Sequence, residues 1–354
     1  MAAGAAAAFQ GEGFDFAMAR YNRNGTLDTS FGAGGIVKTD FGGGESIQAL
    51  VLQSDGKLVA AGTSVIRPEG EPFVSSFALA RYHRNGQLDR GFGTGGKVIT
   101  SFTGNERAYA LLVQPDGMLV AAGTSSSAET VGDFALARYN HDGSLDPLFG
   151  VGGRVTTDFV GMPDEANALV LQDGKLVAAG SAGTFEGSDF ALARYNLDGS
   201  LDLRFGVNGK VTTTFDPGSD FNSHQILDLV LQDGKLVAGG SLMTGMIDSI
   251  QFDFGLARYN RDGTLDTRFG VDGRVITDFG GVEGANALAL QADGKIVAAG
   301  WAEIGDTPAD FALARYKKSD LGQPCAPDLG WPLPAHANEM GRTPPLRRMI
   351  QAVR

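Results

Sequence analysis

Acidic side chains at five positions give this chain its clearest potential for chemistry. Carboxylate oxygens are the ligands that hard divalent cations prefer in proteins. If the segments that carry these acids converge, they could hold a divalent metal ion, and such a site would serve a hydrolase or lyase acting on a small molecule. The weak metal candidates, each in a polar segment that leads into an apolar run, are Glu45, Asp164, Glu165, Asp220 and Glu283.

Aromatic and polar side chains in variable segments form a second group of candidates. Interleaved with acids, they could bind a protein, a glycan or a small cationic ligand. Trp301 differs most from its equivalents in the chain, which are Thr63, Thr124, Ser181 and Ser241. The alternative interpretation is ordinary loop variation. The candidate binding residues are Phe73, Tyr109, Phe185, Glu186, Phe221, His224 and Trp301.

Other kinds of chemistry find no support in the sequence. No phosphate-binding G-x-x-x-x-G-K-[ST] loop occurs, so we expect no nucleotide cofactor, and no G-x-S-x-G, H-E-x-x-H or C-x-x-C pattern is present. The four histidines stand at unrelated positions. The stretch 260–266 resembles part of a calcium loop, but Arg258 occupies the position of its first carboxylate. We therefore interpret this stretch as a structural turn.

The net charge restricts the expected partners. The chain carries a formal charge of −12, from 29 basic and 41 acidic residues. A negative field repels phosphate groups, so we expect no nucleic acid partner. One cysteine excludes an internal disulfide, and no apolar run approaches the ~20 residues that cross a bilayer, so we expect no membrane insertion. The first residues lack a clear export signal, which leaves the compartment open, and we expect a monomer.

A repeat determines the elements that position these residues. The segment Phe-Ala-Leu-Ala-Arg-Tyr, or a close variant, begins at residues 16, 77, 134, 190, 254 and 311, at intervals of 56 to 64 residues. A period near sixty that contains several short strand-like pieces indicates β-rich units stacked in space.

One unit contains four predicted antiparallel strands, which we label a to d. Residues 168–171 form a buried strand, and an Asp-Gly turn at 173–174 leads to the return strand 176–180. Residues 190–195 form the third strand, with Phe, Leu and Arg on one face and Ala, Ala and Tyr on the other. Residues 210–215 form the fourth. Such units repeated around an axis predict an all-β fold, the β-propeller.

The strand count sets the expected number of blades. Strands a and b occur five times, whereas the first strand d, between Leu27 and Phe41, precedes the first strand a. Because this strand could complete the last unit, we favour five four-stranded antiparallel blades, with six including an incomplete blade as the alternative. The expected segments are a disordered head at 1–13, the propeller at 14–316 and a proline-rich, mostly disordered tail at 317–354.

A recurring arginine shares one face of the third strand with large apolar residues. An unpaired buried charge is costly, so each arginine needs a partner. An aspartate recurs shortly after it, as Asp202 follows Arg194. We therefore predict one structural Arg–Asp ion pair in each repeat.

The repeat resembles a known family. The string LQxDGKLVAAG … DFALARYNxDGSLDxxFGxxG resembles the bacterial delta-60 repeat and is similar in layout to NHL-type propeller repeats. The match extends from about Phe14 to Tyr316 and recurs five times. The resemblance implies a propeller scaffold, often secreted or at the cell surface, and no common activity.

The geometry of a meander indicates where a site lies. The a–b and c–d turns share one end of the unit, and the b–c and d–a loops share the other. The a–b and c–d turns have nearly the same sequence in every repeat, whereas the b–c and d–a loops vary in sequence and length. Binding residues usually lie on variable loops held by a rigid frame. We therefore expect a non-enzymatic binding or structural module that acts through its b–c/d–a face. A metal-assisted propeller hydrolase or lyase at the same face is the alternative.

Overall fold

All regular elements of the described structure are β-strands. The computed structural model describes residues 1–7, 13–67, 70, 72–102, 104–127, 131–215, 222–246, 249–305 and 308–318. The expected tail at 317–354 therefore lies outside the described residues, apart from Lys317 and Lys318. The described part of the chain contains no helix with the length and apolar character needed to span a bilayer. The all-β class is confirmed.

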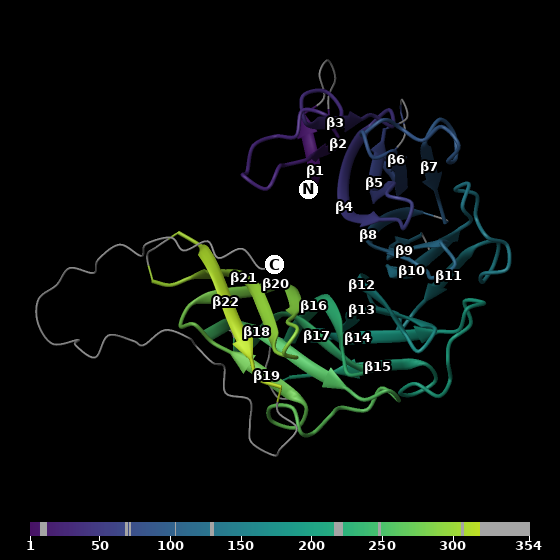
Figure 1. Ribbon diagram of the computed structural model, residues 1–354. Coiled ribbons are helices and arrows are strands. Elements are labelled where there is room, and N and C mark those ends of the chain that lie inside the picture. Colours follow the sequence, from purple (N-terminus) through teal and green to yellow (C-terminus); the bar gives the residue numbers. More distant parts are fainter. Residues whose placement is uncertain are drawn as a thin grey trace, which may run out of the picture.

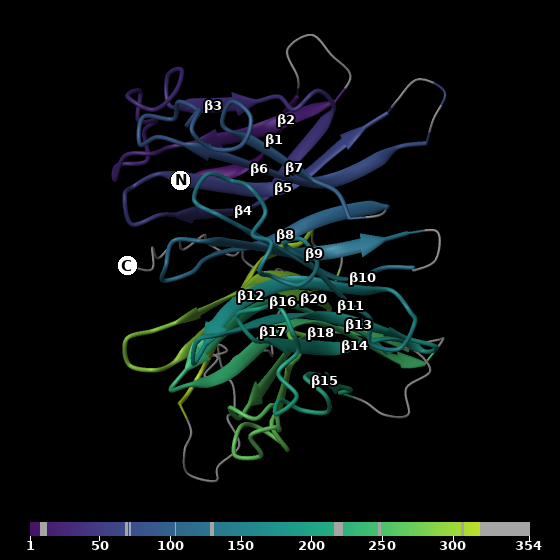
Figure 2. The same cartoon turned by 90° about the vertical axis from the view of Figure 1, so that its right-hand side faces the viewer.

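Consecutive strands pair antiparallel and form six meanders, numbered I to VI. They follow one another along an arc (Figure 1), and a view turned by 90° shows the strands of neighbouring meanders stacked side by side (Figure 2). Meander I contains β1 Ala2–Ala7, β2 Phe14–Ala19 and β3 Ile36–Thr39. Meander II contains β4 Gly44–Leu52, β5 Leu58–Ile66, β6 Val74–Tyr82 and β7 Lys97–Thr100, and meander III contains β8 Asn105–Val113, β9 Leu119–Ser126, β10 Asp133–Tyr139 and β11 Arg154–Thr157.

The second half of the chain repeats this plan. Meander IV contains β12 Asp164–Gln172, β13 Lys175–Thr184, β14 Gly187–Tyr195 and β15 Lys210–Thr213. Meander V contains β16 Asn222–Gln232, β17 Lys235–Met246, β18 Ser249–Tyr259 and β19 Arg274–Thr277, and meander VI contains β20 Val282–Leu290, β21 Ile296–Glu303 and β22 Asp310–Tyr316. Short parallel pairings of β14 with β16 and of β18 with β20 join meanders IV to VI into one sheet of 11 strands.

Five blades closed by the first strand d are not confirmed. That strand is β3, and it pairs with β2 of its own meander, with Thr39 opposite Phe16. Ala2–Ala7, part of the expected disordered head, forms β1 and pairs with the other edge of β2. Pairing with a strand nearby in the sequence loses less chain entropy than pairing with a strand at the far end of the chain. No sheet of the described residues closes on itself.

The core consists of five apolar clusters, one between each pair of successive meanders. Phe77 and Leu79 of β6 pack in the same cluster as Ala135 and Ala137 of β10 in the next meander. The predicted two-faced third strand therefore allows close approach, because its large face meets the small face of its neighbour. At each junction a tyrosine hydroxyl also bonds a threonine of the preceding meander, in the pairs Tyr82–Thr39, Tyr139–Thr100, Tyr195–Thr157, Tyr259–Thr213 and Tyr316–Thr277.

The predicted Arg–Asp ion pairs are confirmed and lie at the end of the meanders formed by the c–d turns. Nε of Arg194 donates to Oδ2 of Asp202 at 2.8 Å, and both residues are buried. The adjacent turn at 260–266 is held by Asp262, which accepts the amide hydrogen of Thr264 at 3.0 Å, as expected of a structural turn. The five pairs are Arg20–Asp28, Arg81–Asp89, Arg138–Asp146, Arg194–Asp202 and Arg258–Asp266.

Candidate functional site

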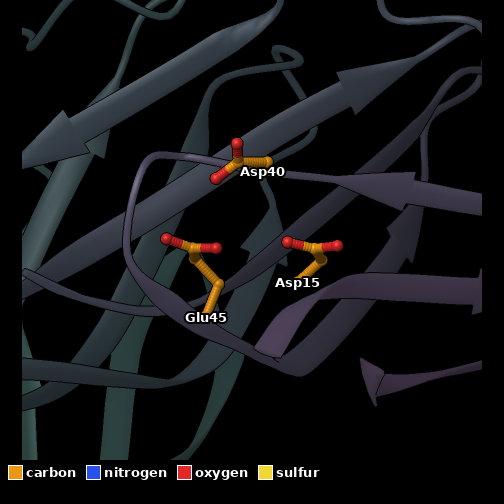
Figure 3. A group of neighbouring side chains, drawn as sticks. All are labelled: Asp15, Asp40 and Glu45. Atoms are coloured by element: carbon orange, nitrogen blue, oxygen red, sulfur yellow. The ribbon is translucent and has the colours of Figure 1, made fainter. Parts of the chain in front are cut away.

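Three carboxylates meet at the b–c/d–a end of the junction between meanders I and II. Asp15 is the second residue of β2, Asp40 follows β3, and Glu45 is the second residue of β4. Figure 3 shows their carboxyl groups facing a common space. One oxygen of each residue lies within 4.8 Å of the others. We refer to these three residues as triad 1.

Strand register explains why these residues come together. Phe16 of β2 pairs with Thr39 of β3, so Asp15 and Asp40 are the next residues along the two strands and lie side by side. The short link from β3 to β4 then brings Glu45 to the same place. The rings of Phe16 and Phe41 pack edge to face with centroids 5.0 Å apart, which holds this strand end in position.

The same register builds two further triads. Triad 2 lies between meanders III and IV, and triad 3 lies between meanders V and VI. In all three triads the first and third residues are buried and the middle residue is exposed. Each triad is therefore a cluster of three carboxylates, two of them buried and one exposed to solvent. Triad 2 is Asp133, Asp158 and Asp164, and triad 3 is Asp253, Asp278 and Glu283.

Backbone donors fix the orientation of the third residue in each triad. Oε1 of Glu45 accepts the amide hydrogen of Gly43 at 2.9 Å, and Oε1 of Glu283 accepts that of Gly281 at 2.8 Å. In both glutamates Oε2 is buried and has no hydrogen-bond partner. Asp164 differs, because both of its carboxylate oxygens accept amide hydrogens.

Burial raises the pKa of several of these carboxyl groups. It raises the pKa of Asp164 to about 7, and the negative charges of Asp158 and Asp133 add to the shift. In triad 3, burial together with the charges of Asp278 and Glu283 raises the pKa of Asp253 to about 6. The triads thus bring like charges together in a partly dry environment, an arrangement that suits a cation or a shared proton.

At the two remaining junctions, other residues occupy positions equivalent to those of the triads. Between meanders II and III, Ser76 and Ser101 bond each other at 2.9 Å in place of the two aspartates, beside the buried Glu106. Between meanders IV and V, Thr214 donates to Asp189 at 2.8 Å, and a histidine takes the third position. Acidic triads therefore occur at alternate junctions.

A pocket of about 390 Å³ opens at the same end of the molecule, across meanders II, III and IV. Phe73, which is 58% exposed, offers it an aromatic surface, and Arg67 lies over this ring at 4.9 Å from its centroid. The polar lining combines hydroxyl, amide, guanidinium and carboxylate groups. The lining residues that matter most here are Phe73, Asn105, Arg107, Ser126, Asp164 and Glu165.

The pocket gathers several of the predicted residues around Arg107. Burial raises the pKa of Glu165, and the positive charge of Arg107 opposes that shift. Tyr109 lies in a bulge of β8 between Ala108 and Ala110, and its pKa is raised by burial and by the charge of Glu165. The structure thus places Phe73, Asp164 and Glu165 in the pocket lining and Tyr109 close to it.

The other predicted binding residues lie elsewhere. Phe185 is 98% exposed at the β13–β14 turn, and neither it nor Glu186 lines the pocket. His224 is fully buried against Phe215, with ring centroids 5.6 Å apart, so it does not present a surface to a ligand. Trp301 lies opposite Phe311 in meander VI, away from the pocket. Asp220 and Phe221 lie outside the described residues.

The sequence predicted one member of each triad but not its two partners. Glu45, Asp164 and Glu283 were metal candidates, and each is the third residue of a different triad. The partners had a signal in the sequence, since an aspartate precedes the recurring Phe-Ala-Leu segment and another stands in a recurring Thr-Asp-Phe, as at Asp15 and Asp40. Only the pairing register shows that these positions converge.

A family model matches the repeats. The model described as "Domain of unknown function (DUF5122) beta-propeller" matches residues 1–31, 53–92, 114–149, 171–205, 231–269 and 291–320, which together make up more than half of the chain. The match supports a family of β-propeller repeats. A comparison with curated proteins found no match.

Solved structures show a distant likeness. A protein of unknown function from Dyadobacter fermentans has a TM-score of 0.42 at 14% identity, over 85% of this chain and 90% of that one. A GH43 endo-arabinanase from Bacillus licheniformis has a TM-score of 0.37 at 12% identity, over 77% and 94%. The β-propeller domain of the Trilobed protease from Pyrococcus furiosus has a TM-score of 0.38 at 11% identity, over 79% and 69%. Likenesses of this size carry no argument about a ligand or a reaction.

Proposed function

Since the chain belongs to the family of β-propeller domains described as DUF5122, we propose that it is a non-enzymatic binding module with its ligand in the pocket at the b–c/d–a face. We also propose that its repeats are of the delta-60 type. The observation that carries the proposal is the pocket itself, because residues of three successive meanders build it and no single repeat could. Its volume of about 390 Å³ falls within the range of small-molecule sites, about 300–1,000 Å³.

The lining favours a glycan among the expected partners. Arg107 and Glu165 place a donor and an acceptor of opposite charge beside each other, and together they can exchange hydrogen bonds with the hydroxyl groups of an uncharged sugar. Asn105 and Ser126 add amide and hydroxyl groups that can exchange hydrogen bonds with sugar hydroxyls. The exposed ring of Phe73 offers an apolar face against which a sugar ring can pack.

Saccharide binding tests the proposal. A glycan array would identify the bound saccharide, and calorimetric titration of the full chain would give its affinity. We expect Phe73→Ala and Arg107→Ala each to weaken binding about tenfold or more, a loss of about 1.4 kcal/mol, because each removes a side chain that lines the pocket. Both side chains are exposed, so the melting temperature should stay unchanged.

Phe185→Ala is the matched control. It also removes an exposed phenylalanine from a loop on the same face, but from outside the pocket. Its affinity should equal that of the unaltered chain. An array without a bound saccharide, or an equal loss of affinity in Phe185→Ala, would contradict the proposal.

A metal-assisted hydrolase or lyase is the second candidate function, and one observation favours it. Asp164 lines the pocket and also belongs to triad 2, so a cation held there would face a ligand in the pocket. A cation in that position could polarise a carbonyl or activate a water molecule. Hydrolysis of the bound saccharide that needs a divalent ion and disappears in Asp164→Asn would favour the enzyme over the binding module.

A further inference from the structure

Two of the three carboxylate triads contain a buried carboxylate oxygen without a hydrogen-bond partner, and this observation supports an inference beyond ligand binding in the pocket. We propose that triads 1 and 3 each bind one Ca²⁺ ion, which bridges two successive meanders at the b–c/d–a end. In each triad the first two residues belong to one meander and the third belongs to the next. An ion held by all three would therefore tie the two meanders together.

Unpartnered buried oxygens support a cation independently of the clustering. Glu45 is 1% exposed and Glu283 is 0% exposed. In both residues one carboxylate oxygen is held by backbone donors, whereas Oε2 is buried without a hydrogen-bond partner. Leaving a buried carboxylate oxygen unsatisfied costs free energy, and a cation would satisfy it. Figure 3 shows the carboxyl group of Glu45 facing Asp15 and Asp40.

The spacing of the oxygens fits one ion. Calcium lies about 2.3–2.6 Å from its oxygen ligands, so two ligands on opposite sides of the ion are separated by about 5 Å. The three oxygens of each triad lie within 4.8 Å of one another. The exposed middle residue leaves one side open, where water can complete the six to eight ligands that calcium takes. The donor set is all oxygen, which favours Ca²⁺ or Mg²⁺ over metals that prefer sulfur or imidazole.

A lysine near triad 1 does not replace the ion. Nζ of Lys97 donates to the main-chain oxygen of Asp40 at 2.9 Å. This contact involves the backbone and brings at most one positive charge to three carboxylates. The net charge of −12 favours the entry of cations further.

Calcium stoichiometry tests the proposal. The full chain would be treated with a chelator, dialysed and titrated with CaCl₂ in a calorimeter. We expect two equivalents to bind and the melting temperature to rise with Ca²⁺ concentration. Asp40→Asn, which alters the exposed member of triad 1 and should fold normally, should lower the stoichiometry from two to one. Asp278→Asn should do the same through triad 3, and the double variant should bind none.

The acid-poor junction supplies the matched control. Glu106→Gln alters the equivalent of Glu45 between meanders II and III, where Ser76 and Ser101 replace the two aspartates. This variant should still bind two equivalents, and circular dichroism would confirm that it is folded. Absence of binding at ~10 mM Ca²⁺, a stoichiometry that Asp40→Asn leaves unchanged, or a stoichiometry that Glu106→Gln lowers would each overturn the proposal.

Discussion

Arg194 shows how one repeated side chain joins three parts of the structure. Its guanidinium bonds Asp202 in its own meander at 2.8 Å, Gln172 at 2.9 Å and the main-chain oxygen of Arg261 in the next meander. It also lies over the ring of Phe205, 4.5 Å from the centroid. A planar group with donors on several edges can make these contacts at once, whereas a lysine ammonium cannot.

We therefore expect Arg194→Lys to destabilise the protein by about 1–3 kcal/mol, because it keeps the charge but loses hydrogen bonds of a buried ion pair. Urea denaturation would measure the loss. Arg204→Lys is the control, since Arg204 is exposed and should tolerate the change within about 0.5 kcal/mol. Equal stability of Arg194→Lys and the unaltered chain would show that the planar guanidinium of Arg194 is not needed for stability.

The same ion pair makes stability depend on acid pH. Burial alone would raise the pKa of Asp202, but hydrogen bonds from Lys175 and from the backbone of Arg204, with the charge of Arg194, hold it below its usual value of 3.8. The unfolded chain therefore binds the proton more readily than the folded chain. This stabilisation is present above pH about 4 and is lost as the pH falls through the folded pKa.

Denaturation curves between pH 7 and pH 2.5 would test this dependence. Asp202→Asn should be less stable at pH 7, and its stability should fall less steeply below pH about 4, because one titrating group is gone. Parallel curves for the two proteins would indicate that Asp202 has the same pKa in the folded and unfolded chains.

At the scale of the strand, a bulge interrupts the pairing of the first strand in each of the five a–b hairpins. In β12 the register shifts between Ala166 and Ala168, so Asn167 has no partner in β13. Next to this bulge the backbone of Glu165 lies close to Gly180 of β13. A Cβ at Gly180 would be 1.8 Å from the carbonyl oxygen of Glu165. The same close approach occurs at the equivalent glycines, Gly62, Gly123, Gly240 and Gly300.

Gly180→Ala should therefore destabilise the protein by about 1–3 kcal/mol or more, because the methyl group forces the bulged backbone to move. Since Glu165 lines the pocket, ligand affinity should fall as well. Gly4→Ala is the control, as Gly4 also lies in a strand but has no atom within 4 Å of the added Cβ. Thermal melts should show a lower melting temperature for Gly180→Ala than for Gly4→Ala. Equal melting temperatures would refute the steric argument.

The strands that could be predicted from the sequence are those marked by a short sequence pattern of their own. Asp-Gly turns between apolar runs marked hairpins such as β12–β13, and the structure has them. β1 was missed because Ala2–Ala7 lacks β-branched and large apolar side chains. Its only signal was the resemblance of Ala2-Ala3-Gly4 to the Ala-Ala-Gly of the second strand in four of the five a–b hairpins. The triads were predictable only in part, because they depend on a cross-strand register that no single segment contains.

For the whole molecule, the two end meanders each present one face that an inner meander would cover. The large face of every inner third strand is buried, as at Phe254 and Leu256. On β22 the equivalent Phe311 is fully exposed and Leu313 is largely exposed. At the other end Tyr21 is exposed, whereas its equivalents bond a threonine of the preceding meander. Stability in such an array comes from neighbour contacts, so it should differ between inner and end units.

Replacing the first phenylalanine of the recurring motif in meander V and in meander VI tests how stability is distributed between inner and end meanders. Phe254→Ala should cost about 3–5 kcal/mol, because it opens a cavity in the apolar cluster between meanders V and VI. Phe311→Ala should change the free energy of unfolding by no more than about 0.5 kcal/mol, since the ring touches little in the described structure. The two residues occupy the same repeat position, so each controls for the other in chemical denaturation. Comparable losses would mean that a further part of the chain or a second molecule covers β22 in solution.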